Sequence, residues 1–100
     1  MTSGTASNPD VAYVLPSRLD APAAPGLAED LRSHMADAAG VKIDISAVAL
    51  IDTPAIEVLL AADRQLDGQI TLTGTGETVS AAMTTLGLAE VYQRWRQADG

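Results

Sequence analysis

A threonine between an aspartate and a proline is the group best placed for chemistry in this chain. Asp52-Thr53-Pro54 follows an apolar stretch and precedes residues with helical spacing. A hydroxyl residue before a proline is typical of a helix start, where the hydroxyl caps the helix and the proline takes the first helical position. A phosphate added there would meet backbone N–H groups and the positive end of the helix dipole. Thr53 is therefore placed where an added phosphate would have its largest local effect, and a plain N-cap is the alternative interpretation.

The other reactive groups do not assemble into a catalytic or metal site. His34 is the only histidine and the chain has no cysteine, so no nucleophile–base pair is evident. Gly74-Thr75-Gly76 lacks the third glycine of a dinucleotide-binding loop, and a tight turn explains it. We interpret the scattered carboxylates as a solvated acidic face without metal-ligand spacing: Asp44, Asp52, Glu57, Asp63 and Asp67. The sequence therefore predicts no enzyme activity, no metal and no cofactor.

The net charge and the first residues of the chain argue against binding to nucleic acid or anionic lipid and against secretion. A formal net charge of −7 repels the phosphates of nucleic acids and anionic lipids. Residues 1–9 lack the basic and apolar regions of a secretion signal, and we expect a disordered leader before one domain over 10–100. No stretch approaches the ~18 apolar residues of a membrane helix. We therefore expect a cytoplasmic protein that does not bind nucleic acid and does not insert into membranes.

Alternating strands and helices must position Thr53. Apolar, β-rich runs predict strands over 11–15, 41–45 and 69–73, with a turn over 17–20. Helical spacing predicts one helix from residue 21 up to Gly40, a second over 54–65, a third ending at Gly87 and a short fourth over 88–95. This order predicts an α/β fold with a small, mostly parallel β-sheet and about four helices. On the fourth helix, core packing is favoured over an exposed aromatic anchor for Tyr92 and Trp95.

Several motifs together resemble the STAS domain of anti-sigma factor antagonists. Lys42–Leu60 resembles its central signature, a strand with an aspartate near its end, an apolar stretch, and then Asp-Ser/Thr-Ser/Thr-Gly opening a helix. Ser17–Asp20 resembles the family's Gly-x-Leu-Asp turn, and Leu86-Gly87-Leu88 its Leu-x-Gly-Leu motif. The matching positions of the signature are Asp44, Ser46, Asp52 and Thr53. The resemblance implies a STAS-like fold over nearly the whole chain.

The resemblance also implies a switch by phosphorylation, although this chain differs from the family at two positions of the phosphorylated motif. In the antagonists a hydroxyl residue of this motif is phosphorylated by a partner anti-sigma kinase, which breaks the complex. Here Pro54 replaces the second hydroxyl and Ala55 replaces the glycine, so Thr53 is the acceptor that remains.

Two kinds of binding protein are compatible with these features. The first is a regulatory protein switched at Thr53, with an anti-sigma serine kinase or a chemotaxis-type signalling protein as partner. The alternative is a constitutive accessory subunit of an ABC-type lipid transport complex, in which the threonine helps to hold the ATPase. Either way, we expect the partner to contact Asp20, Asp52, Thr53, Pro54, Ala55 and Glu57. Asp20 is assigned because it should lie near the same edge, although a plain turn aspartate also explains it.

Overall fold

Three apolar runs of the sequence form a parallel sheet, as predicted. The computed structural model describes residues 11–36 and 38–97, so the expected leader lies outside the described residues. The strands β1 (Val11–Val14), β3 (Val41–Asp44) and β5 (Ile70–Thr73) lie in the order β1-β3-β5, and both pairs are parallel. Val41 is paired with Val11 on one side and Ile70 on the other, which aligns alternate side chains of all three strands on one face.

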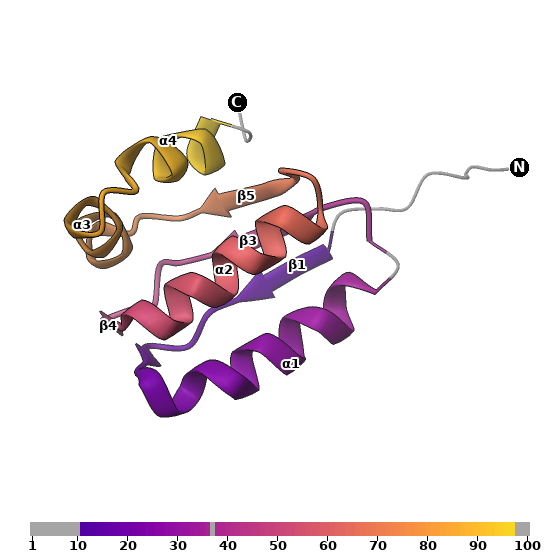
Figure 1. Ribbon diagram of the computed structural model, residues 1–100, viewed down its shortest axis with the longest axis horizontal. Coiled ribbons are helices and arrows are strands. Elements are labelled where there is room, and N and C mark those ends of the chain that lie inside the picture. The colour runs from indigo at the N-terminus through magenta and orange to yellow at the C-terminus, as the bar shows by residue number, and fades with distance from the viewer. Residues whose placement is uncertain (1–10, 37, 98–100) are drawn as a thin grey trace, which may run out of the picture.

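The helices cover one face and one edge of this sheet. They are α1 (Ala24–Met35), α2 (Thr53–Gln65), α3 (Glu77–Thr85) and α4 (Ala89–Gln97). Figure 1 shows α1 and α2 side by side across the same face, with α4 beside β5. The α/β fold with four helices and a small parallel sheet is therefore confirmed.

The first helix begins later than predicted. A 3₁₀ turn, η2 (Ala21–Ala23), precedes α1, and a proline lies in the first turn of each. Proline lacks a backbone N–H and is tolerated only in the first turn of a helix, so Pro22 and Pro25 divide the stretch into two helix starts. Asp20 caps the first of these by accepting a hydrogen bond from the Ala23 N–H.

The structure contains two short strands, of two residues each, that the sequence did not predict. The predicted turn over 17–20 contains β2 (Arg18–Leu19), which pairs in parallel with β4 (Leu50–Ile51) as a separate small sheet. The Asp52 N–H extends this pairing by donating to the Leu19 carbonyl oxygen at 2.9 Å. This small sheet holds the segment before η2 against the segment before α2.

The core lies between the sheet and the helices. Its largest fully buried side chain is Trp95 of α4, and Tyr92 is also buried, so their assignment to the core is confirmed. Apolar residues of the sheet and of α1 and α2 complete the same cluster, among them Leu31, Ile43 and Leu59. By contrast, the opposite face of the sheet exposes Val14 and Lys42. Within residues 11–36 and 38–97, no helix combines the length and apolar character needed to cross a bilayer.

Candidate protein-binding surface

Helix α2 begins at Thr53, one residue earlier than the capping interpretation requires. Asp52 is the N-cap residue, with extended backbone angles, and Thr53 is the first helical residue. The prediction that Thr53 caps the helix with Pro54 at the first position is therefore wrong by one place. The Thr53 side chain is exposed at this helix start, so it is accessible to a partner or a kinase.

Few backbone donors remain free at this helix start. Pro54 has no N–H, and the Ala55 and Ile56 N–H groups both donate to the Asp52 carbonyl oxygen, at 3.0 and 3.3 Å. A phosphate on Thr53 would have to compete with that carbonyl for these two donors. The predicted stabilisation of such a phosphate by backbone N–H groups is therefore weak, and its main effect would come from its charge and size.

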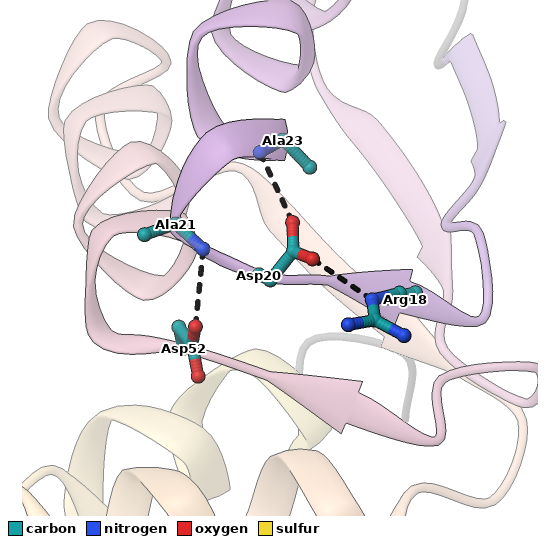
Figure 2. Close-up of polar contacts among 5 residues, drawn as sticks. All are labelled: Arg18, Asp20, Ala21, Ala23 and Asp52. Atoms are coloured by element: carbon teal, nitrogen blue, oxygen red, sulfur yellow. Dashed lines mark hydrogen bonds and ion pairs between the residues drawn. The ribbon is translucent and has the colours of Figure 1, made fainter.

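The two aspartates of the predicted site lie together, as Figure 2 shows. The Ala21 N–H donates to Asp52 Oδ2 at 3.0 Å, whereas the Ala23 N–H donates to Asp20 Oδ1 at 3.2 Å. The Asp52 carboxylate therefore ties the start of η2 to the start of α2 and does not cap its own helix. This cross-link fixes the edge at which Thr53 is exposed.

An ion pair orients Asp20 at the same edge. Arg18 Nε donates to Asp20 Oδ2 at 2.8 Å (Figure 2), and the arginine side chain is largely exposed. The hydrogen bond from Arg18 is the main cause of a lowered pKa of Asp20, with a smaller lowering from the Ala23 N–H. Asp20 thus stays ionised, and we assign it a local structural role that shapes this edge.

The six predicted contact residues differ in what they can offer a partner. Asp52, Thr53 and Glu57 are exposed, and Asp20 and Pro54 are half-buried. Ala55 is fully buried in the core, so its methyl group packs inward. Thr53 and Glu57 are four residues apart and therefore share one face of α2.

Exposed residues continue that face along the whole of α2. Ala61, Arg64 and Gln65 follow Thr53 and Glu57 at helical spacing, and all are exposed. Thr53 thus stands at one end of an accessible helix face about three turns long.

The aspartate of the central signature has a structural role at the carboxyl end of β3. Asp44 Oδ1 accepts hydrogen bonds from both the backbone N–H and the hydroxyl of Ser46. Both hydrogen bonds lower the pKa of Asp44, and the bond from the Ser46 hydroxyl has the larger effect. Gly74 lies directly against this pair, since a Cβ built there would overlap Ser46 Oγ. The signature residues therefore close the turn after β3 against the turn after β5.

The sheet order, the Asp44 turn and the exposed threonine at the start of α2 agree with a single family. The family model of the STAS domain matches residues 4–98, nearly the whole chain. The chain belongs to the STAS domain family. STAS domains are regulatory domains that act through contacts with other proteins. No curated protein sequence matches the chain closely enough to add a more specific role.

One carboxylate of the predicted acidic face is a buried structural group in this STAS domain. Asp63 is 9% exposed and accepts hydrogen bonds from Arg94 Nη2 at 2.6 Å and Trp95 Nε1 at 3.0 Å. Its assignment as a solvated residue is therefore wrong, because α4 packs over that side of α2. Over residues 11–36 and 38–97, no group of three histidine or acidic side chains is close enough to hold a metal ion.

The structure also contains a groove that the sequence analysis missed. It lies between α1 and α2 of the STAS domain and is lined by residues of both helices. The helical spacing of α1 contained part of the signal, since Ala28 and Arg32 lie on one face with Leu31 and Met35. What the spacing did not reveal is that α2 would lie beside this face and leave a hollow.

Proposed function

We propose that this STAS domain is a regulatory adaptor that binds a partner protein through the edge at Asp52 and Thr53 and the outer face of α2, and is switched by phosphorylation at Thr53. The observation that carries the proposal is the exposed Thr53 hydroxyl at the first position of a helix whose accessible face continues for about three turns. The proposed partner is an anti-sigma serine kinase or a chemotaxis-type signalling protein. In this proposal the STAS domain itself catalyses no reaction.

The switch follows from the charge that a phosphate would add. A partner kinase would transfer the γ-phosphoryl group of ATP to Thr53 Oγ1, leaving ADP, while the hydroxyl proton is released. The product carries about 1.5 to 2 additional negative charges beside the Asp52 carboxylate and one turn from Glu57. A partner that packs apolar or acidic surface here would have to desolvate that dianion, so the complex would dissociate.

One observation favours a constitutive role as the second candidate. Pro54 lacks an N–H, and the N–H groups of the next two residues donate to the Asp52 carbonyl oxygen. The helix start would therefore stabilise a phosphate on Thr53 only weakly. In that case the Thr53 hydroxyl would serve directly as a contact to an ABC-type ATPase, and the domain would be an accessory subunit of a lipid transport complex.

The two candidates differ in one measurement. The tagged domain is used to isolate its partner from the source cells, and the purified pair is incubated with Mg²⁺ and ATP before intact-mass analysis. Addition of one phosphoryl group to the wild type and none to Thr53→Val supports the switch. An unchanged mass with the complex intact supports the constitutive subunit.

A second measurement tests the binding surface itself. Thr53→Glu should weaken partner binding at least 10-fold, as measured by titration with the purified partner. Lys42→Glu is the control, since it adds negative charge on the exposed opposite face of the sheet and should leave the affinity unchanged. Equal affinities for the wild type and Thr53→Glu would overturn the assignment of this surface.

A further inference from the structure

The groove between α1 and α2 has an apolar floor. Leu31 and Met35 of α1 and Val58 of α2 line it, and the first two are buried core residues. Ala28 and Ala61 also line it, and their small side chains leave a hollow of about 610 Å³ that is open to solvent. Ala28 and Val58 are half-buried and Ala61 is exposed, so part of this apolar lining is accessible to a partner.

Charged groups are separated along this groove. Arg32 lies in the last turn of α1 and Arg64 in the last turn of α2, and both side chains line the groove. Glu57 lines it closer to the start of α2. Because α1 and α2 each return from one parallel strand to the next, they run in the same direction and their basic turns lie at the same end (Figure 1). One end of the groove is therefore basic, and Glu57 stands toward the other.

The two arginines are not engaged elsewhere in the part of the chain that the structure describes. Arg18 and Arg94 form ion pairs with Asp20 and Asp63, whereas no ion pair within residues 11–36 and 38–97 involves Arg32 or Arg64. The whole chain has a formal net charge of −7, so two arginines beside one hollow form a local basic patch. A partner that carries an anionic group next to an apolar group would complement these arginines and the hollow beside them.

We infer that the α1–α2 groove binds an amphipathic helix of a partner protein, whose apolar stripe fills the hollow and whose acidic side chains meet Arg32 and Arg64. This inference rests on the proposed function, because it names the chemistry of the partner that the α2 surface takes. The groove extends along α2 from Pro54 to Gln65, which corresponds to roughly 16 Å or three turns of a partner helix. Such a helix would present anchors at i, i+3, i+4 and i+7.

The shape of the groove favours a helix over a small amphiphile. A site for a small organic ligand buries roughly 70–90% of the ligand surface, whereas this hollow is an open trough between two helix ridges. A third helix laid along the trough packs its side chains between those ridges, as neighbouring helices do in α-helical proteins.

The test uses a pair of stapled, amphipathic 15-residue helices with the same Leu/Ala stripe. One carries two glutamates at the end of the stripe and the other carries lysines in their place. Titration into the ¹⁵N-labelled domain should shift amides of α1 and α2 with the acidic helix and at least 10-fold more weakly with the basic helix. Absence of saturable shifts, shifts confined to other surfaces, or equal affinity for the two helices would overturn the inference.

Matched variants connect the binding to named groups. Arg64→Glu should weaken the acidic helix at least 10-fold, whereas Lys42→Glu makes the same change in net charge on the opposite sheet face and should have no effect. Ala61→Trp should fill the hollow and block binding, while Ala81→Trp, at an exposed position of α3, should not. An affinity that is unchanged in Arg64→Glu and Ala61→Trp would refute the assigned contacts.

Two further arms identify other occupants. In the first, laurate is added below its critical micelle concentration. Tighter binding of laurate than of the acidic helix would show that a small amphiphile occupies the groove and would refute the proposal of a partner helix. Concentration-dependent shifts of the same amides without any peptide would make it a contact between two copies, with the same consequence. If the peptides do not bind the groove, Thr53→Glu can still weaken binding of the partner. If the Thr53 tests fail, the peptides can still bind the groove. The two proposals can therefore be refuted separately.

Discussion

The indole N–H of Trp95 donates a hydrogen bond to Asp63 Oδ1 at 3.0 Å, and this bond joins α4 to α2. Trp95 is fully buried and Asp63 is 9% exposed. The second carboxylate oxygen accepts from Arg94 at 2.6 Å, so both oxygens are satisfied by neighbouring residues of α4. Since α4 also lies beside β5 (Figure 1), this contact fastens the last helix to the helix that carries the proposed binding face.

Trp95→Phe should destabilise the domain by about 1.5–3 kcal/mol. The change removes a buried hydrogen bond and part of a fully packed ring, and it leaves one oxygen of the buried Asp63 without its donor. Tyr92→Phe on the same helix removes only a hydroxyl and should cost about 0.5 kcal/mol or less. Urea unfolding followed by circular dichroism measures both free energies of unfolding. Equal losses in the two variants would contradict a specific role for the indole N–H.

Periodicity predicted the main sheet and all four helices because each has several residues of alternating or helical spacing. It could not predict β2 and β4, because two residues carry no periodicity and these strands exist only through their pairing. The start of α2 was displaced by one residue for a related reason. Thr53 is a good capping residue by type, yet the Asp52 N–H is held by Leu19 of β2, and this contact lies far away in the sequence.

The candidate site was predictable only where its residues belong to a local motif. Asp52 and Thr53 were found because a helix start has its own sequence signature. Asp63 was misassigned because its burial comes from α4, more than thirty residues later. The groove was missed because its two walls belong to separate helices, and its depth depends on the small side chains of Ala28 and Ala61.

Asp52→Ala should loosen the edge at which Thr53 is exposed. The variant removes the acceptor of the Ala21 N–H and should cost about 0.5–1.5 kcal/mol of unfolding free energy, as for a single hydrogen bond. Asp52→Asn keeps a side-chain oxygen in place and should cost less than half as much. Chemical denaturation gives both values, and the Ala21 amide resonance should shift more in the alanine variant. A stability order in which asparagine is the worse substitution would contradict this account.

Arg18→Met should raise the pKa of Asp20 toward its ordinary value of 3.8, because the hydrogen bond from Arg18 is the main cause of the lowering. A lowered folded-state pKa means that the unfolded chain binds more protons in this range. The contribution of this pair to stability is therefore complete above about pH 4 and is lost as the pH falls through the folded-state pKa. Carboxyl ¹³C titration measures the shift. Asp44, whose pKa is lowered by Ser46, is the internal control and should titrate as before.

Gly74→Ala should destabilise the domain more than Gly68→Ala. Both glycines have positive φ, +81° and +83°, so each alanine carries a backbone penalty of about 1 kcal/mol. The space beside them differs: a Cβ at Gly68 meets nothing within 4 Å, whereas one at Gly74 overlaps the Ser46 hydroxyl and lies 2.8 Å from Asp44 Oδ1.

The atoms that a Cβ at Gly74 meets are the ends of the Ser46 and Asp44 side chains, and moving them would break the hydrogen bond between them. The cost of Gly74→Ala should therefore exceed that of Gly68→Ala by about 1 kcal/mol, a typical value for one hydrogen bond. Ser46→Gly removes the overlapping hydroxyl, so in its background Gly74→Ala should lose much of its excess cost. A double-mutant cycle measured by urea unfolding gives this coupling free energy. Additive effects of Ser46→Gly and Gly74→Ala would show that the turns after β3 and β5 are not held in contact by this pair, and the structural explanation of the STAS signature at Asp44 would then be lost.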